Sequence, residues 1–317
     1  MSTAIRRSIE SLMNPNNTST LWPPPRSAYR EISSFCKLTK PKLDALKSWL
    51  DEHASRFEEP RYLESDPLGC VVGYESPVDR EVVGFLTAMM AWGRREIVIQ
   101  KTSQLLESLG PHPAQKILQS NEEQWAIWFA DFRHRTFNVI DVITFLRGLK
   151  SNLQTYGTLE GAWKDSFETV GRDPASLMSE FQFRFREAAA PFPSRTSRHI
   201  SSPDSKTASK RLWMYLRWMI RGGGPVDLGQ WTFMTPAELR IPLDVHVGRQ
   251  SRRLGLLKRK ANDALAVEQL TSVLRYLDPE DPVKYDYAFL GIGIEGESLT
   301  NTDKVDLNGV NSARFSS

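Results

Sequence analysis

The stretch DREVVGFLTAMMAWGRREIVIQKTSQLLESLG, residues 79–110, carries the pattern that decides the fold. Asp79 is a favourable residue at a helix start, and Gly110 followed by Pro111 is typical of a helix end. The first half of the stretch is almost entirely apolar, whereas a surface helix has one apolar and one polar face. We therefore predict one helix over 79–110, with its first half buried at the centre of the protein.

The rest of the chain also shows helical periodicity. In 40–57, for example, leucines recur at the spacing of one helix face. Further helices are predicted over 138–157, 158–171, 174–189, 206–224, 243–257, 264–278 and 282–296. No segment alternates as a strand does and no repeat is visible, so we predict an all-α protein. The one long connection, 190–205, is either functional or mobile.

The length and composition suggest a single helical domain between two tails. The chain has 317 residues, and its hydrophobic content of 40% is sufficient for a core. Residues 1–38 are rich in Ser, Asn, Thr and Pro, so we predict a flexible N-terminal extension. Its arginines would also fit an organelle transit peptide, although NPNNTST and WPPP make a poor amphipathic helix. The domain is predicted over 39–295, and residues 296–317 form a polar, flexible tail.

Charge and cysteine content limit the classes of function. There are 41 basic and 38 acidic residues, a net charge of +3, so any argument for nucleic acid must be local. Cys36 and Cys70 are too few for a disulfide framework, a four-cysteine zinc site or an iron–sulfur cluster. No apolar run approaches the roughly 18 residues of a membrane span. We expect a soluble, cytoplasmic and nucleoid-associated protein without membrane contact, a bound metal or a cofactor.

Two neighbouring segments carry cations without acids. Five basic residues and no acid lie between Ser205 and Val226, and six lie between Val245 and Ala261. These are Lys206, Lys210, Arg211, Arg217 and Arg221, and then Arg249, Arg252, Arg253, Lys258, Arg259 and Lys260. On a helix, Lys210, Arg217 and Arg221 fall on one side. A solvated face usually mixes both signs, so these faces favour contact with nucleic-acid phosphates.

Asp244 has two interpretations. Pro242 fixes its own φ and favours an extended Ile241, which places Asp244 at the start of the 243–257 helix. In the first interpretation the carboxylate is only an N-cap. In the second it faces a cleft and does chemistry.

The string PLDVHVGRQSRRLGL, residues 242–256, resembles the aspartate-bearing segment of the helix-hairpin-helix (HhH-GPD) DNA glycosylases. The resemblance implies that Asp244 is the catalytic carboxylate, that His246 and Arg249 belong to the helix-start signature, and that Arg253 lies at its end. More of the chain, about residues 60–295, resembles the bacterial DUF2400 family of unknown function. This likeness rests on DREVVGFLTAMMAWGRR, SKRLWMYLRWMIR, VDLGQW, IPLDVHV and DPVKYDYAFLGIG.

The chain departs from the bifunctional glycosylases. It has no Leu-Pro-Gly-x-Gly hairpin with a catalytic lysine before Asp244, and no cysteine cluster follows the site. The archaeal 8-oxoguanine glycosylase branch is more similar, because its hairpin is altered and its lysine lies near the start of an apolar helix. Lys210 opens such a helix here, and Lys206 is a second candidate.

The implied activity is a DNA glycosylase, possibly with AP lyase activity, that excises a modified or oxidised base. A carboxylate stabilises the oxocarbenium charge that develops on the sugar, and a lysine forms a Schiff base at C1′. Lys210 and Asp244 are the predicted catalytic pair. The predicted partner of this monomer is damaged DNA, as duplex or single strand. The alternative is a non-catalytic nucleic-acid-binding protein that retains the fold.

Predicted nucleic-acid contacts complete the site. They are Arg94, Arg95, Arg211, Arg217, Arg221, His246, Arg249, Arg252 and Arg253. Arg94 and Arg95 are alternatively partners of a helix C-terminal dipole. The tryptophans Trp213, Trp218 and Trp231 either line a pocket for a flipped base or, as is usual for this residue type, belong to the core.

Overall fold

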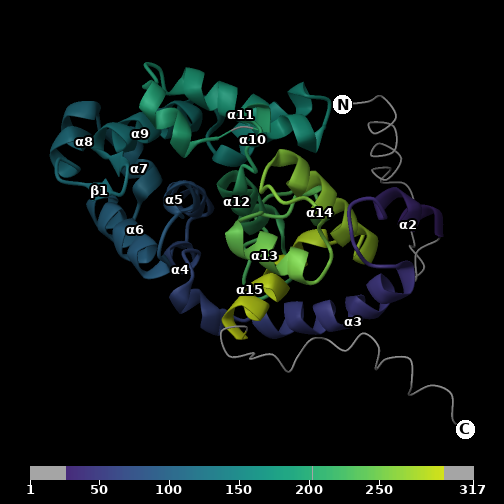
Figure 1. Ribbon diagram of the computed structural model, residues 1–317. Coiled ribbons are helices and arrows are strands. Elements are labelled where there is room, and N and C mark those ends of the chain that lie inside the picture. The colour runs from purple at the N-terminus through teal and green to yellow at the C-terminus, as the bar shows by residue number, and fades with distance from the viewer. Residues whose placement is uncertain (1–25, 202, 296–317) are drawn as a thin grey trace, which may run out of the picture. The chain divides into compact units, whose positions relative to one another are not determined.

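The computed structural model describes residues 26–201 and 203–295, and its described part is almost entirely helical (Figure 1), which confirms the all-α prediction. The chain divides into two compact units. Unit 1 comprises Met1–Glu58 and Pro236–Ser317, and unit 2 comprises Glu59–Thr235. The sequence predicted one domain over 39–295. Among the described residues, 26–58 and 236–295 lie in unit 1, and 59–201 and 203–235 lie in unit 2.

Unit 1 is built around the pair of helices α3 and α15. Its elements are α2 (Arg26–Ile32), α3 (Lys40–Phe57), η4 (Pro236–Glu238), α13 (Val245–Arg253), α14 (Ala264–Leu277), η5 (Pro282–Lys284) and α15 (Tyr285–Glu295). The predicted leucine face of α3 is buried. Gly291 lets α15 approach α3 closely, because a Cβ at this position would lie 2.0 Å from Phe57 Cδ2.

Helix α2 lies within the segment predicted as a flexible extension. Ile32 and Cys36 are each only 1% exposed, and the Tyr29 hydroxyl donates to the Leu38 carbonyl at 2.7 Å. Residues 26–38 are therefore packed as part of unit 1. The remainder of the predicted extension, 1–25, and the predicted tail, 296–317, lie outside the described residues.

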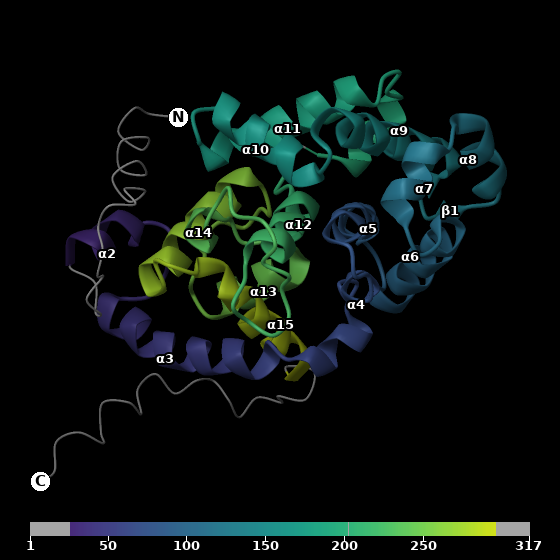
Figure 2. The ribbon, with the colours of Figure 1, turned by 180° about the vertical axis from the view of Figure 1, so that it is seen from behind.

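Unit 2 surrounds helix α5, as Figures 1 and 2 show. Its elements are η1 (Pro60–Ser65), α4 (Gly69–Val72), α5 (Pro77–Met90), α6 (Arg95–Leu109), α7 (Pro113–Gln119), α8 (Glu122–Trp128), β1 (Arg133–His134), β2 (Phe137–Asn138), α9 (Val139–Tyr156), α10 (Leu159–Thr169), α11 (Pro174–Ala188), η2 (Ser194–His199), η3 (Pro203–Ser205) and α12 (Lys210–Ile220). Helices α4, α6, α7, α10 and α12 contact α5.

The predicted single helix over 79–110 is two helices. Helix α5 ends at Met90 and α6 begins at Arg95, because the chain turns between them with Gly93 at φ +105. Glycine adopts this conformation without steric cost. The first helix also begins earlier than predicted, at Pro77. Asp79 accepts from the Ala114 backbone N–H at 2.8 Å and so holds the start of α7.

The other predicted helices are found with shifts of one or a few residues, except at 206–224. There, Lys206 and Ser209 have φ values of +60 and +46, which delays the start of α12 until Lys210. The long 190–205 connection contains η2 and η3, and the two-residue strands β1 and β2 were not predicted. Trp213, Trp218 and Trp231 are at most 3% exposed and belong to the core.

Candidate functional site

Asp244 is the N-cap of α13 in unit 1. Its backbone is extended, with φ −115 and ψ −168, and its Oδ1 accepts from the Val247 backbone N–H at 2.9 Å. Asn262, a residue that the sequence did not single out, donates from Nδ2 to the Asp244 carbonyl at 3.0 Å. The capping interpretation is thus confirmed as geometry. Asp244 is only half-buried, so the hydrogen bond fixes its carboxylate while the residue stays partly accessible to solvent.

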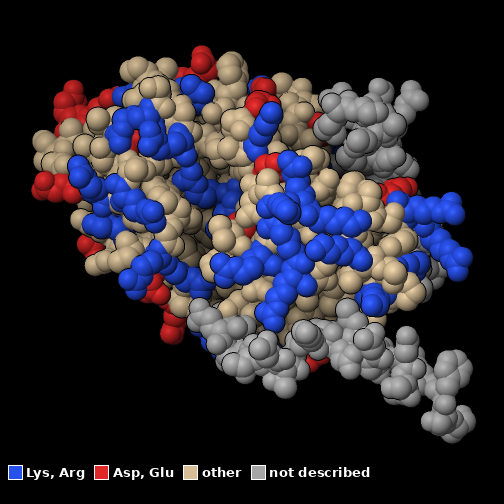
Figure 3. Space-filling view, viewed as in Figure 1, with Lys and Arg blue, Asp and Glu red and all other residues tan. Residues whose placement is uncertain are grey.

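The exposed face of α13 begins beside this carboxylate. Val245, His246, Arg249 and Arg253 are all exposed, and their spacing places them on one side of the helix. The opposite side, with Val247, is buried. Figure 3 shows Lys and Arg side chains gathered over the part of unit 1 that carries α13. Three of the predicted nucleic-acid contacts therefore share one solvent-facing surface with Asp244 at its start.

Arg252 does not belong to this surface. Its Nε donates to the Arg259 carbonyl at 2.6 Å, and its Nη2 donates to the Ala261 carbonyl at 3.0 Å and to Asn262 Oδ1 at 2.6 Å. A Cβ on Gly248 would lie 2.5 Å from the same Asn262 oxygen, so this glycine permits the loop to pack closely. The Arg252 guanidinium holds the 259–262 loop, and its contact with nucleic acid stays a prediction.

The predicted cationic face of α12 in unit 2 is wrong for two residues. Arg217 Nε lies 3.3 Å from Asp227 Oδ1, and Arg221 Nη1 lies 3.1 Å from Asp227 Oδ2. All three side chains are at most 8% exposed. The acid-free segment ended at Val226, one residue before this aspartate. The chain then runs back along α12, where Leu228 N–H donates to the Trp218 carbonyl at 2.8 Å, which brings the carboxylate to both arginines.

Arg211 has a structural role at the start of α12. It donates from Nη1 to the Met89 carbonyl at 2.5 Å and from Nη2 to the Arg198 carbonyl at 2.9 Å. Its guanidinium lies 5.0 Å from the centre of the Trp92 ring, and burial lowers the pKa of Arg211 to about 10. The predicted DNA contact by Arg211 is therefore replaced by contacts within unit 2.

The two lysine candidates differ in position. Lys210 is the first residue of α12, as predicted, and is half-buried. Lys206 is exposed and precedes the helix, in a turn after η3. Asp244 belongs to unit 1 and both lysines belong to unit 2.

Arg94 and Arg95 lie at the start of α6 and not at the end of α5. Arg94 is the N-cap residue, with its side chain 84% exposed and 3.9 Å from Glu96 Oε2. Cations interact favourably with a helix dipole only at the C-terminus. The alternative in which these arginines neutralise a C-terminal dipole is therefore excluded.

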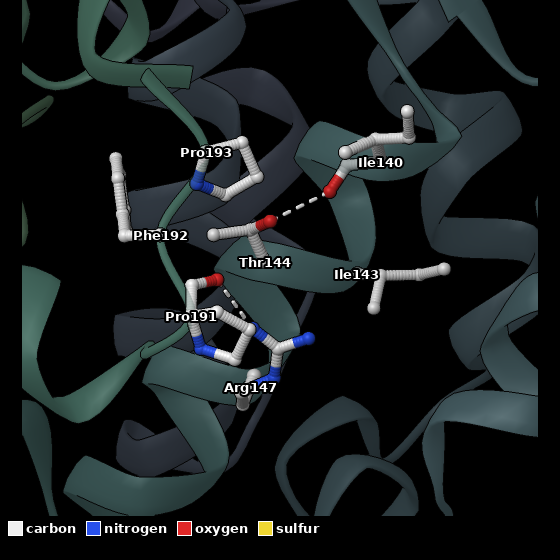
Figure 4. Close-up of a pocket in the computed structure, with 7 residues that line it drawn as sticks. All are labelled: Ile140, Ile143, Thr144, Arg147, Pro191, Phe192 and Pro193. Carbon is white, nitrogen blue, oxygen red and sulfur yellow. Dashed lines mark hydrogen bonds between the residues drawn. The ribbon is translucent and has the colours of Figure 1, made fainter. Parts of the chain in front are cut away.

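An open pocket in unit 2 contains none of the predicted site residues (Figure 4). Its lining is mostly apolar and comes from α9 and from the proline-rich segment after α11: Ile140, Ile143, Thr144, Arg147, Pro191, Phe192 and Pro193. Arg147, its one charged side chain, is bound to both oxygens of Glu122 and to the Pro191 carbonyl at 2.8 Å. This pocket offers no reactive group.

Metal clusters and membrane-spanning helices are not found in the described residues. Within 26–201 and 203–295, no three His, Cys, Asp or Glu side chains gather as metal ligands. No helix in the same ranges is long and apolar enough to cross a membrane.

Comparison with known proteins gives one match. Residues 66–295, more than two thirds of the chain, match the model of a family described as protein of unknown function (DUF2400). No curated protein and no solved structure matches the chain.

Proposed function

The chain belongs to the DUF2400 family, and we propose that this member is a DNA glycosylase that excises a modified or oxidised base. The proposal includes a helix-hairpin-helix glycosylase architecture with an altered hairpin, as in the archaeal 8-oxoguanine branch. One observation carries it. Asp244 begins a helix whose exposed face presents His246, Arg249 and Arg253, which combines a fixed carboxylate with cations for the flanking phosphates.

Asp244 supplies the electrostatic part of the reaction. When the bond between C1′ and the base nitrogen breaks, its electron pair leaves with the base and positive charge develops on the sugar. A carboxylate fixed beforehand stabilises this charge without reorganisation. The Val247 N–H fixes Asp244 Oδ1, and the Asn262 side chain fixes the Asp244 carbonyl. The same acceptor bond that caps the helix thereby orients the carboxylate.

The nucleophile is water or Lys210. If water attacks C1′, its proton passes to a base and the product is an abasic site. If the unprotonated Lys210 amine attacks instead, the C1′–Nζ bond forms as the base leaves with the electron pair of its bond to C1′, and the C1′–O4′ bond then breaks, with O4′ taking a proton, to give a Schiff base. That intermediate permits strand cleavage. Lys206 is the alternative amine.

A non-catalytic nucleic-acid-binding protein is the second candidate. The observation that favours it is the cap itself, because a 2.9 Å bond from Asp244 to the helix start accounts for an aspartate at this position without any chemistry.

The proposal is tested on the full chain with a panel of duplexes, each with one modified base, in the presence and absence of borohydride. We expect base release from at least one lesion. Covalent trapping that is lost in K210Q and kept in K206Q identifies Lys210 as the nucleophile. Trapping lost only in K206Q assigns Lys206 instead, and release without trapping indicates attack by water. Tight, lesion-independent binding with no release from any duplex would contradict the proposal in favour of the second candidate.

A further inference from the structure

Arginines from four segments of unit 2 surround the loop between α5 and α6. Two lie at the start of α6, two in the β1–β2 hairpin, two in η2 and one at the start of α12. In sequence order they are Arg94, Arg95, Arg133, Arg135, Arg195, Arg198 and Arg211. The first and last of these segments are more than a hundred residues apart in the sequence, so their proximity is a property of the fold.

Contacts to the loop bring these segments together. His134 Nε2 lies 3.2 Å from the Trp92 carbonyl oxygen, and the His134 ring meets the Trp92 ring edge to face. Arg135 lies against Gly93, where a Cβ would be 2.7 Å from the arginine Nη1. From η2, the His199 ring centre lies 5.2 Å from that of Trp92. The hairpin and η2 thus pack on the same indole.

Two of the arginines hold this arrangement in place. Arg211 links the end of α5 to η2 through the Met89 and Arg198 carbonyls. Arg195 donates from Nη2 to the Thr136 carbonyl at 2.9 Å, which links η2 to the hairpin turn. These bonds connect α12, the end of α5, η2 and the hairpin turn through fixed guanidinium groups.

Four arginines, which we call the arginine platform, are exposed: Arg94, Arg133, Arg135 and Arg198. Figure 3 shows Lys and Arg side chains gathered over the part of unit 2 that carries β1 and α6. The nearby acids do not balance them. Glu96 is 77% exposed at 3.9 Å from Arg94, Asp131 is exposed, and Asp141 is buried and bonded to Thr196 at 2.7 Å. The platform therefore presents a surplus of positive charge to solvent.

Two platform arginines occupy positions where the backbone prefers another residue. Arg94 is the N-cap of α6 but its side chain makes no capping bond, whereas Ser, Thr, Asp or Asn would. Arg135 has φ +56, a conformation that favours glycine or asparagine. The local backbone therefore does not explain why arginine stands at either position.

We infer that the arginine platform binds the sugar–phosphate backbone of a nucleic-acid strand without reading its sequence. A guanidinium group donates two parallel hydrogen bonds to phosphate oxygens. Here Arg195 and Arg211 hold the segments that carry the exposed arginines. The inference rests on the proposed function for its choice of partner. It adds a second contact surface, in unit 2, to the cationic face of α13 in unit 1.

The test combines two substitutions that suit the local backbone. R94S supplies an N-cap and R135N supplies a residue that tolerates positive φ, so the double variant R94S/R135N should melt at or above the wild-type temperature. Its affinity for a fluorescein-labelled, lesion-free oligonucleotide, measured by anisotropy, should fall about tenfold, and the slope of log K against log salt should decrease by about two. The control K116Q/K164Q removes two exposed cations elsewhere in unit 2 and should change neither.

Equal affinity of R94S/R135N and the wild type would overturn the inference. So would wild-type protein that sediments with phosphatidylserine vesicles but gives no anisotropy change with the oligonucleotide, since the partner would then be a membrane surface. The proposed excision is measured separately on lesion-bearing duplexes. Excision without a platform effect refutes only the platform, whereas a platform effect without excision refutes only the glycosylase.

Discussion

Helices α12 and α13 have the same charge pattern in sequence but differ in the exposure of their arginines. Each belongs to a segment with several cations and no acid, and each is followed within two residues of that segment's end by an aspartate. After α12, Asp227 pairs with Arg217 and Arg221 in the interior of unit 2. On the α13 side, Asp263 pairs only with Arg259, at the surface of unit 1. Arg249 and Arg253 are exposed. The arginines at the end of α12 are therefore part of the core, whereas those of α13 form a cationic surface.

The difference shows that the sign pattern of a segment does not determine its exposure. The apolar face of α12 is wide, and Arg217 and Arg221 lie at its border, where a returning chain covers them. In α13 only a narrow side is buried, so the cations on the remainder meet water. The counter-charge of the two buried arginines is Asp227, the first acid outside the segment.

The largest expected effect is on the α12 side. D227N keeps the shape of the side chain but leaves two buried guanidinium groups without a counter-charge, which should lower the free energy of unfolding by about 3–5 kcal/mol. Urea unfolding measures the change. The matched variant D263N retains a good N-cap for α14 and loses a surface pair, so it should cost at most about 1 kcal/mol. Similar costs for both variants would remove the contrast between the helices.

A smaller effect of burial is expected at His199 in η2. Desolvation, assisted by Arg211, Arg198 and Arg195 and opposed by Asp141, lowers the pKa of His199 from 6.5 to about 4. The folded protein therefore favours the neutral ring, and this stabilisation is complete above pH 6.5 and is lost as pH falls towards 4. The loss should be about 2–3 kcal/mol.

The pH dependence is measured by urea unfolding at several pH values between 7 and 4. H199Q should remove most of the decrease, while H112Q, which removes an exposed histidine, should keep it. An equally steep decrease in H199Q would mean that other groups cause it.

The smallest effect on stability is expected at the exposed cations of α13. R249Q/R253Q should change the free energy of unfolding by less than about 0.5 kcal/mol, because both side chains lie in water. Its affinity for any duplex should nevertheless fall about tenfold, with a flatter salt dependence. Unchanged affinity alongside unchanged stability would leave the cationic surface of α13 without a function.

Local signals predicted much of the fold. The helices at 40–57, 138–157 and 264–278 have their predicted bounds to within one residue, because their caps and glycine stops act on neighbouring residues. The start of α5 was misplaced because Asp79 accepts from the Ala114 N–H of α7, and the break after α5 was missed because Gly93 turns between two helices. Such partners are set by tertiary contacts, which a sequence window does not contain.

The candidate site, like the fold, was predictable where local signals determine it and not where tertiary contacts do. Asp244 at a helix start follows from local rules and is found there. Lys210 was singled out through the family resemblance, and the helix predicted from residue 206 begins at Lys210. The loop contacts of Arg252 could not be predicted, because its acceptors are backbone carbonyls of a folded loop. The platform arginines were missed apart from Arg94, although the sequence RHR at 133–135 was a signal, because they meet only in three dimensions.

The most direct test of the central claim is base excision by D244N. Asparagine caps a helix as well as aspartate does, so D244N should melt within a degree or two of the wild type and bind lesion-bearing duplex at least as tightly. D244A, in contrast, should lose about 1 kcal/mol of stability with the cap. If Asp244 stabilises the developing charge on the sugar, D244N should release base at least about a hundredfold more slowly than the wild type. Wild-type rates of release in D244N would contradict the account and leave Asp244 as a cap alone.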